Sequence, residues 1–168
     1  MSKFKRLQGK YLGHPLRLLI ATAKGVAAAH LFSEYAYSVS GTWGASMMPT
    51  FEAIHDQVLI SRFYRGGKGI VVGDIVTFDS VVEPGARVIK RVLGLEGDYV
   101  LRDTPGDSST MVQVPQGHVW VIGDNLPYSR DSRHFGPVPK ALIKGKVIAK
   151  VLPFKERKWI VNGLQPAG

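Results

Sequence analysis

Residues 87–93 read Arg87-Val88-Ile89-Lys90-Arg91-Val92-Leu93, an apolar stretch with two adjacent cations in its middle. Its β-branched residues predict a β-strand. Because successive side chains of a strand point to opposite faces, Lys90 shares a face with Val88 and Val92, whereas Arg91 lies on the other face. At most one of the two cations can therefore face solvent if one face of the sheet is buried.

Similar short runs, rich in β-branched and aromatic residues, recur on both sides of this stretch. Gly, Pro, Asp and Asn separate them, as is typical of strands joined by turns. The runs are residues 57–61, 73–78, 99–101, 118–122 and 144–152. No sustained helical period appears after residue 41, apart from a turn near Pro139. We predict a mainly β fold, an antiparallel sheet that is curled or barrel-like so that few edges are exposed.

The composition excludes several kinds of site and partner. The 168 residues include no cysteine, so disulfides and thiolate metal sites are not available, and the five histidines are scattered. We therefore predict no metal site. The net charge of +9 suggests nucleic-acid binding, but six of the 22 basic residues lie in the first 24 positions, and no aromatic stripe alternates with cations. We expect no nucleic-acid partner; a basic β-domain that binds nucleic acid stays an alternative supported by charge alone.

The first 40 residues differ from the rest. Residues 1–15 are basic and polar, and the stretch from Leu16 to about Val39 is long and apolar enough to cross a hydrocarbon core of about 30 Å as a helix. Lys24 and Glu34 weigh against insertion, since a charge near the centre costs about 2.5 to 3.5 kcal/mol. We predict an anchor helix at about 16–39 within segment 1–40, followed by one domain, 41–168. A helix lying on the membrane or packed on the domain, and a cleaved targeting peptide, are alternatives.

Residues 44–50, Gly44-Ala45-Ser46-Met47-Met48-Pro49-Thr50, form a small-residue turn with one hydroxyl in its middle. A serine is a weak nucleophile at its ordinary pKa and needs a base nearby. Lys90 offers one, because burial in an apolar strand disfavours the charged form of a lysine and lowers its pKa. Such a lysine accepts a serine proton without any histidine. The alternative is that Lys90 is an exposed strand lysine with no catalytic role.

Polar residues follow the run at 118–122. Gly123-Asp124-Asn125 predicts a tight turn, and Asp131 beside Arg133 predicts a local ion pair. Ser129 and Ser132 are hydroxyls in the same loop. Taken singly, each of these residues is more typical of structure than of catalysis.

Four sequence boxes nevertheless occur together in one order. They are residues 46–50, 73–76, 90–98, and 123–138 with Ser129, Asp131-Ser132-Arg133 and Gly136-Pro137-Val138. In that order and spacing they resemble the type I signal peptidases, a family of membrane-anchored Ser-Lys proteases, from about residue 40 to 152. The resemblance implies a serine endopeptidase with a β-fold catalytic domain and with no metal or organic cofactor.

The resemblance also implies a role for each matching position. Ser46 matches the nucleophile of the family, and Lys90 matches its general base. Ser129 matches the hydroxyl that hydrogen-bonds and orients the lysine. Asp131 and Arg133 match a structural pair that supports the site.

Three further positions bear on the environment of the nucleophile. Asp124 matches a turn residue of its motif rather than a triad acid, and Met47 matches an apolar wall where substrate binds. Many bacterial members have a serine two residues before the nucleophile, where its hydroxyl donates to the oxyanion; here that position is Gly44. The oxyanion is then expected to bind the Ser46 backbone N–H and a further donor that the sequence does not identify. Loss of one such donor costs about 100- to 1,000-fold in rate elsewhere.

Features outside the four boxes resemble the mitochondrial inner-membrane members of the family. They are Ala29-His30 and Glu34-Tyr35 before the serine, and Gly117-His118-Val119-Trp120 leading into residues 123–126. They imply a protein of the mitochondrial inner membrane whose catalytic domain faces the intermembrane space. The implied partners are a homologous second subunit, in a heterodimer, and protein substrates that carry sorting presequences.

Two alternatives within the same sequence pattern stay open. A self-cleaving repressor-type domain also uses a Ser-Lys pair, but it needs a DNA-binding module, and residues 1–40 lack a helix-turn-helix pattern. An inactive homologue that serves as a structural partner is the other alternative. Ser46 and Lys90 argue against it, whereas Gly44 keeps it open.

Overall fold

The structure is a computed structural model that describes residues 14–104 and 110–164. It divides into two compact units, Met1–Ala36 and Tyr37–Gly168, and each is described by itself. The second is called the β unit below. The basic stretch noted at residues 1–13 lies outside the described residues.

The first unit contains helix α2, Pro15–Tyr35. Proline suits its first turn, where a backbone N–H has no helical acceptor. No residue of α2 is buried, and by length and composition the helix could cross a membrane. The helix predicted at about 16–39 was too long at its C-terminal end. Residues 37–40 belong to a strand instead, in which Tyr37 pairs with Ser61 and Val39 pairs with Leu59.

The described part of the β unit contains ten strands and one short α-helix. The strands are β1 (Tyr37–Trp43), β2 (Ile54–Ser61), β3 (Ile75–Asp79), β4 (Arg87–Gly94), β5 (Tyr99–Leu101), β6 (Met111–Gln113), β7 (His118–Ile122), β8 (Val138–Pro139), β9 (Ile143–Leu152) and β10 (Lys158–Trp159), and the helix is α3 (Ser132–Phe135). All runs predicted as strands form strands. The sequence did not identify β1, β6, β8 and β10, and three of these have only two or three residues.

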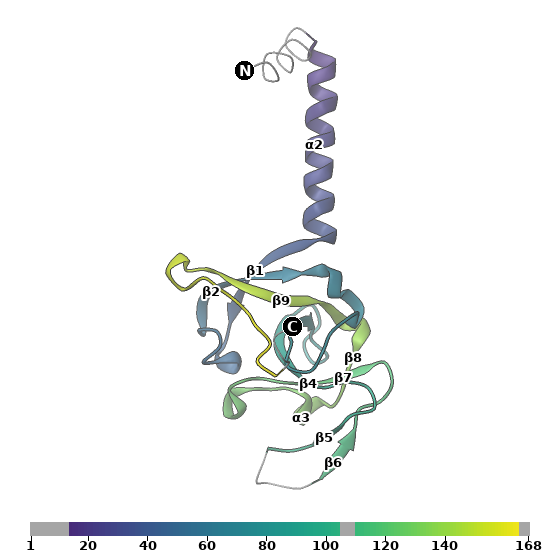
Figure 1. The fold of residues 1–168 in the computed structure, drawn as a ribbon, viewed down its shortest axis with the longest axis vertical. Coiled ribbons are helices and arrows are strands. Elements are labelled where there is room, and N and C mark those ends of the chain that lie inside the picture. Colours follow the sequence, from purple (N-terminus) through teal and green to yellow (C-terminus); the bar gives the residue numbers. More distant parts are fainter. Residues whose placement is uncertain (1–13, 105–109, 165–168) are drawn as a thin grey trace. The chain divides into compact units, whose positions relative to one another are not determined.

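Most of the strands form one antiparallel sheet in the order β1-β2-β9-β3-β4-β7-β8, and β10 pairs with β9. Strands β5 and β6 form a separate hairpin. Figure 1 shows the strands curling round the middle of the unit. The predicted antiparallel β fold is therefore confirmed. The term barrel-like holds only loosely, because β1 and β8 stand at opposite ends of the order and the sheet does not close.

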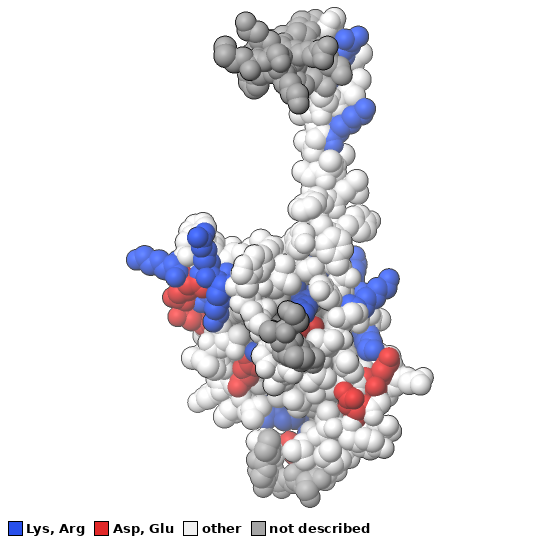
Figure 2. Space-filling model, viewed as in Figure 1, with Lys and Arg blue, Asp and Glu red and all other residues white. Residues whose placement is uncertain are grey.

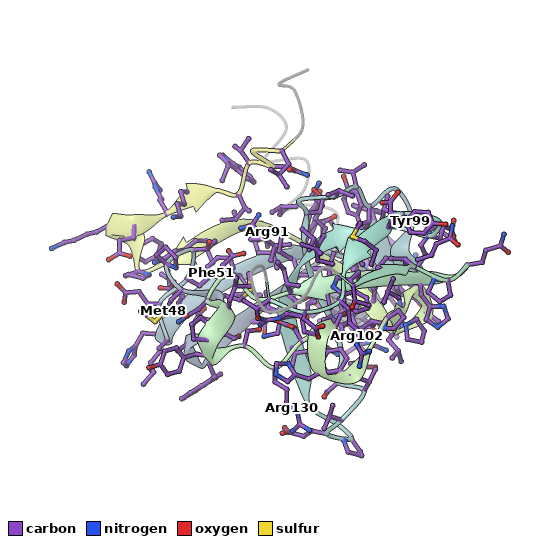
Figure 3. All side chains as sticks on the ribbon, turned by 90° about the horizontal axis from the view of Figure 1, so that it is seen from below. Met48, Phe51, Arg91, Tyr99, Arg102 and Arg130 are labelled. Atoms are coloured by element: carbon purple, nitrogen blue, oxygen red, sulfur yellow. The ribbon has the colours of Figure 1, made fainter. Side chains whose placement is uncertain are left out.

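The core of the β unit lies on both faces of β3 and β4. Strand β3 contributes Ile75 to one cluster and Val76 and Phe78 to the other, as the alternation of a strand requires. The cluster with Ile75 also contains Met47 and Phe51, which follow Ser46 closely in sequence. Figure 3 places Phe51 in the interior of the unit and Arg130 at its outer edge. Burying a side chain such as Phe51 stabilises a fold by about 1.5 to 3 kcal/mol, so packing also fixes the turn that carries Ser46.

A buried ion pair joins β2 to β9. The Nζ atom of Lys150 lies 2.8 Å from Oδ1 of Asp56 and 2.6 Å from Oε2 of Glu156. Both Lys150 and Asp56 are buried. Burial by itself lowers the pKa of Lys150, but its hydrogen bonds to Asp56 and Glu156 more than offset this and raise the pKa. Lys150 is therefore charged at neutral pH.

We expect Lys150→Met to lower the free energy of unfolding by about 3 to 5 kcal/mol, because Asp56 would become a buried carboxylate without its cation. Lys144→Met is a matched control on the same strand. The pair of Lys144 with Asp79 is 28% and 39% exposed, so its loss should cost about 0 to 1 kcal/mol. Urea unfolding followed by circular dichroism measures both variants, and equal losses would contradict the prediction.

Candidate active site

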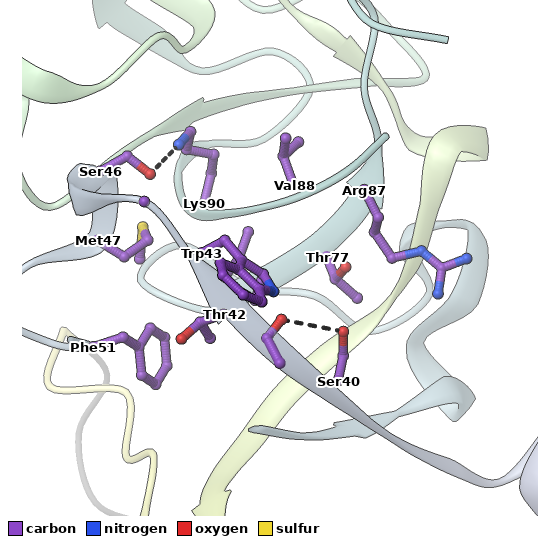
Figure 4. Close-up of a pocket in the computed structure, with 13 residues that line it drawn as sticks. Ser40, Thr42, Trp43, Ser46, Met47, Phe51, Thr77, Arg87, Val88 and Lys90 are labelled. Carbon is purple, nitrogen blue, oxygen red and sulfur yellow. Dashed lines mark hydrogen bonds between the residues drawn. The ribbon is translucent and has the colours of Figure 1, made fainter. Parts of the chain in front are cut away.

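Ser46 and Lys90 lie in direct contact. The Nζ atom of Lys90 is 2.6 Å from Oγ of Ser46, which is hydrogen-bonding distance. Figure 4 shows this contact at one end of a pocket. Ser46 belongs to η1, a short 3-10 turn at Ala45–Met47, and Lys90 belongs to β4. The fold thus brings together the two residues that the sequence suggested as nucleophile and base.

The turn that carries Ser46 is fixed at both ends. It follows Gly44, whose φ of 92° lies in the left-handed region, where a side chain would introduce strain. The Gly44 N–H donates to the carbonyl of Ala53 at 2.8 Å, and the Met48 N–H donates to the carbonyl of Ala45 at 3.2 Å. Met47 is buried in the core while Ser46 is half-buried. The serine hydroxyl is therefore accessible on a turn that has little freedom to move.

Lys90 is held in an apolar strand. It is 4% exposed and lies between Ile89 and Arg91 on β4, with Val92 buried on the same face. Desolvation by burial lowers the pKa of Lys90, and the negative charges of Asp131 and Asp124 offset part of this effect. The lowered pKa is the direction expected from the sequence. It favours the neutral amine, which is the form that accepts a proton.

The loop after β7 holds the Ser46 turn from the side. The backbone N–H of Asn125 donates to the carbonyl of Ser46 at 3.0 Å, and its side-chain Nδ2 donates to the carbonyl of Ala45 at 3.0 Å. A Cβ atom on Gly123 would lie 2.4 Å from the Ser46 carbonyl oxygen and 2.2 Å from Oγ of Ser129. Only glycine permits so close an approach. The Gly123-Asp124-Asn125 motif therefore positions the serine through its backbone.

Asp124 does more than form a turn. Its Oδ1 accepts from Nε of Arg91 at 2.8 Å, and its Oδ2 accepts from Nη2 of Arg91 at 2.7 Å and from the hydroxyl of Thr50. Arg91 also donates through Nη1 to the carbonyl of Gly73 at 2.8 Å. A bidentate arginine–carboxylate pair is geometrically specific. Asp124 thus ties the strand that carries Lys90 to the end of the Ser46 turn.

Asp131 and Arg133 form the ion pair predicted from the sequence. Nε of Arg133 donates to Oδ1 of Asp131 at 2.8 Å, and the N–H of Gly123 donates to Oδ2 at 2.9 Å. Burial by itself raises the pKa of Asp131, but the hydrogen bonds from Arg133 and Gly123 lower it on balance. Asp131 also caps α3, where it accepts from the N–H of Arg133. The pair therefore fixes the loop that carries Gly123.

Ser129 is buried, but it does not make the contact expected from the sequence. Its Oγ has no hydrogen-bond partner among the described residues, so no bond to Lys90 is present. The hydroxyl lies against Gly123, which in turn packs on the Ser46 carbonyl. Ser129 is also close enough to Asp131 to help lower the pKa of that carboxyl. The Ser129 hydroxyl therefore lies beside Gly123 and Asp131 rather than on Lys90.

The backbone around Ser46 offers one candidate oxyanion donor. None of the turn and loop hydrogen bonds within the described residues uses the Ser46 N–H as a donor. Gly44 has no side chain to contribute, and no second donor was predicted. The Ser46 N–H therefore stays the oxyanion donor expected from the sequence, and the structure does not identify a second one.

A pocket of about 110 Å³ opens beside the Ser46–Lys90 contact. Strand β1 lines it on one side and the first half of β4 on the other, as Figure 4 shows. Its other lining residues include Met47, as predicted, together with Phe51 and Thr77. Trp43 stands at its rim and is 81% exposed. Strand β7 pairs with residues 91–94 of β4, so no described strand pairs with the β7 side of residues 87–90.

The described residues offer no group of three histidines or carboxylates that could hold a metal ion. The two carboxylates whose charges act on Lys90, those of Asp124 and Asp131, are each paired with an arginine. Through these pairs Asp124 and Asp131 stabilise the loops around the Ser46–Lys90 contact.

Three residues with clear roles were not assigned any from the sequence. Arg91 and Thr50 bind Asp124, and Asn125 binds the Ser46 turn. The sequence did offer a signal for Arg91. Lys90 and Arg91 are neighbours in one strand and point to opposite faces, so at least one of the two cations had to meet solvent or an ion-pair partner. Nothing in the sequence identified Asp124 as that partner.

Comparison with protein families gives one match that spans the site. The model of the family described as signal peptidase, peptidase S26, matches residues 16–108 and 101–152. The matched residues include Ser46, Lys90 and the loop with Asp131 and Arg133. They cover most of the chain.

Individual relatives agree with this match. Mitochondrial inner membrane protease subunit 1 of Schizosaccharomyces pombe is 40% identical over 147 residues, which are 87% of this chain and 92% of the relative. Mitochondrial inner membrane protease subunit 2 of the same yeast is 35% identical over 153 residues, 90% of this chain and 78% of the relative. A solved signal peptidase I from Enterococcus faecalis is 28% identical, with 47% of this chain and 97% of that chain covered and a TM-score of 0.39.

Proposed function

Because the chain belongs to the signal peptidase family, peptidase S26, we propose that it is a serine endopeptidase that works through a dyad of Ser46 and Lys90. Membership of the family makes the chain a signal peptidase; the dyad is the proposed mechanism. The observation that carries it is the 2.6 Å contact between Lys90 Nζ and Ser46 Oγ. The lowered pKa of Lys90, caused by burial, supports its assignment as the base.

In the proposed reaction the neutral amine of Lys90 takes the proton of the Ser46 hydroxyl while Oγ attacks the scissile carbonyl carbon. The tetrahedral intermediate collapses when the C–N bond breaks, and Lys90 gives the proton to the leaving amine. An ester of Ser46, the acyl-enzyme, is left. Lys90 then takes a proton from water, the hydroxide attacks the ester carbonyl, and Ser46 recovers its proton as the new carboxyl end departs. The Ser46 N–H is the proposed oxyanion donor.

Ser129, Asp131, Arg133 and Asp124 are proposed to act as positioning residues. Ser129 has a buried hydroxyl that packs against Gly123 near Asp131, and its oxygen is proposed to accept from the ammonium of Lys90 when that group carries the transferred proton. Asp131 and Arg133 fix the loop with Gly123, and Asp124 fixes the Ser46 turn through Thr50. These contacts support the geometry without touching the substrate.

The substrate is proposed to bind as an extended strand in the pocket between β1 and β4. Both strands have a free edge there, since β1 is the last strand of the sheet and residues 87–90 of β4 have no second neighbour among the described residues. Main-chain hydrogen bonds along a free edge give affinity, and pockets for alternate side chains give selectivity. Met47 in the pocket wall is proposed to contact the substrate.

The relatives guide the proposal for location and partner. They are named as subunits 1 and 2 of a mitochondrial inner membrane protease, and α2 is apolar enough to cross a membrane. We propose that the chain resides in the mitochondrial inner membrane with the β unit in the intermembrane space. There it would cleave sorting presequences beside a homologous second subunit.

A surface of the β unit suits a position near a membrane. Phe154 and Trp159 are exposed on either side of Lys155, Arg157 and Lys158. Figure 2 shows Lys and Arg side chains gathered around the loop that follows β9, with acidic atoms among them, and Glu156 lies in this loop. Aromatic rings beside cations are typical of contact with anionic membrane surfaces. This observation supports the proposed membrane location.

The proposed dyad is tested by cleavage of a presequence-bearing protein by the full chain in reconstituted membranes, with and without the second subunit. Wild type is compared with Ser46→Ala and Lys90→Met. Methionine keeps most of the lysine stem and deletes the amine, so it tests the base rather than the packing. Both variants should fold and lose cleavage by about 10³-fold or more. Near-normal cleavage by Lys90→Met would place the base elsewhere.

We expect cleavage to depend on pH through Lys90. The base must be neutral, so the rate should fall as the pH drops through the pKa of Lys90 and the amine becomes protonated. Because burial lowers this pKa, the fall should occur below the ordinary lysine value of about 10.4. Single-turnover rates from alkaline pH down to about pH 5 measure the profile. A rate that stays unchanged to the acid end of this range would contradict the assignment.

A further inference from the structure

The C-terminal segment, residues 158–164, packs against the part of the β unit that carries the dyad. Figure 1 shows it in yellow, turning back from the loop that follows β9 toward the middle of the unit. Its first two residues form β10, which pairs with β9, and Ile160 packs against the core cluster that contains Met47 and Phe51. The family match ends at residue 152, so the match assigns this segment no role.

Both polar atoms of the Asn162 side chain are hydrogen-bonded. Its Nδ2 donates to the carbonyl of Val72 at 2.8 Å and to Oδ1 of Asp74 at 2.9 Å, and its Oδ1 accepts from the N–H of Leu164 at 3.0 Å. Gly73 lies between these two acceptors with a φ of 93°, and a Cβ atom on it would collide with the Asn162 amide. Asn162 therefore holds the turn at residues 72–74, which we call the Gly73 turn.

The Gly73 turn in turn holds β4 next to the base. The N–H of Gly73 donates to the carbonyl of Val92 at 2.8 Å, and the N–H of Val92 donates to the carbonyl of Asp74 at 2.8 Å. The carbonyl of Gly73 also accepts from Nη1 of Arg91 at 2.8 Å. Arg91 and Val92 are the two residues of β4 that follow Lys90. The turn that Asn162 holds therefore fixes the strand at the position of Lys90.

Arg91 also joins the Gly73 turn to the Ser46 turn. It donates to Asp124 through Nε at 2.8 Å and through Nη2 at 2.7 Å, and Asp124 accepts from the hydroxyl of Thr50. A continuous set of hydrogen bonds thus connects Asn162 to both halves of the contact between nucleophile and base.

We propose that Asn162 is a positioning residue for the peptidase reaction. By holding the Gly73 turn it keeps Lys90 within hydrogen-bonding distance of Ser46. The inference rests on the proposed dyad and adds a residue that lies beyond the family match. Asn162 does not line the substrate pocket, so its loss should slow the chemical step without weakening substrate binding. A displacement of about 1 Å between reacting groups can cost 100-fold in rate.

The first test is cleavage of a presequence-bearing protein by the full chain in reconstituted membranes, as wild type, Asn162→Leu and Asn162→Asp. Leucine keeps the size of the side chain and removes its hydrogen bonds. Aspartate keeps the acceptor and puts a second carboxylate beside Asp74. In both variants kcat should fall by about 10- to 100-fold, with KM within about twofold of wild type.

Val112→Ala is the control for a loss of stability alone. Val112 lies on the separate β5–β6 hairpin, where it packs against the cluster with Val100, Val114 and Trp120. Thermal unfolding shows how far each variant is destabilised, and kcat is compared at a temperature where all of them are folded. If Asn162→Leu loses no more kcat than Val112→Ala, or if the loss is in KM, the inference is wrong.

Hydrogen exchange tests the same contact without substrate. The amides of Gly73 and Val92 are the ones that bond across the Gly73 turn. Their exchange should become at least about tenfold faster in Asn162→Leu and stay as in wild type in Val112→Ala. Unchanged protection of both amides in Asn162→Leu would overturn the inference, because the turn would then be held without Asn162.

A double-mutant cycle tests the route from Asn162 to the serine. Thr50→Val removes the hydroxyl at the other end of the set of hydrogen bonds. If Asn162 acts through Arg91 and Asp124, the loss of kcat in Asn162→Leu/Thr50→Val is smaller than the product of the two single losses. A loss equal to the product would mean that the two residues act independently, and the proposed route would be wrong.

The outcomes also separate this inference from the proposed function. If Ser46→Ala and Lys90→Met lose cleavage while Asn162→Leu keeps the kcat of wild type, the dyad stands and the role of Asn162 fails alone. If Lys90→Met cleaves as wild type does, the proposed dyad fails, and the inference that rests on it fails as well.

Discussion

The interaction on which the site depends is the contact of a buried lysine with a serine hydroxyl. A lysine in water is an ammonium ion and has no lone pair to offer, so Lys90 becomes a base only because β4 holds it away from solvent. Burial carries a cost for any ionisable group. On β4, Lys90 has apolar neighbours. The two carboxylates that act on it, those of Asp124 and Asp131, are each paired with an arginine, so neither forms an ion pair with Lys90.

The supporting residues act on the two halves of the contact separately. Asn125 and Gly123 hold the Ser46 turn through its backbone, and Asp124 joins that turn to β4 through Arg91. A contact of 2.6 Å between atoms 44 residues apart in sequence needs such support, because a shift of about 1 Å can cost 100-fold in rate. The negative charges of the same carboxylates raise the pKa of Lys90, and they would raise it further without their arginine partners. Their arginine partners therefore serve both stability and chemistry.

Sequence reasoning succeeded where local patterns decide structure. The alternation in residues 87–93 predicted that Lys90 and Arg91 lie on opposite faces of a strand, and the β-branched runs predicted most of the strands. Sequence reasoning failed where partners that are distant in the sequence decide the local structure. The predicted helix ran past Tyr35 because Ala36, Tyr37 and Val39 continue its apolar and aromatic composition, and only pairing with β2 fixes residues 37–39 as a strand. Asp124 was taken for a turn residue because Arg91 and Thr50 are far away in sequence. The bond expected between Ser129 and Lys90 is not formed.

The most direct measurement is the pKa of Lys90 in the folded protein, by NMR titration of isotope-labelled lysine side chains. One resonance should be absent from Lys90→Met, and it should titrate below the ordinary lysine value of about 10.4, because the amine is desolvated. If the Lys90 resonance titrates at or above that ordinary value, Lys90 is an ammonium ion at neutral pH, and its proposed role as the base that activates Ser46 is contradicted.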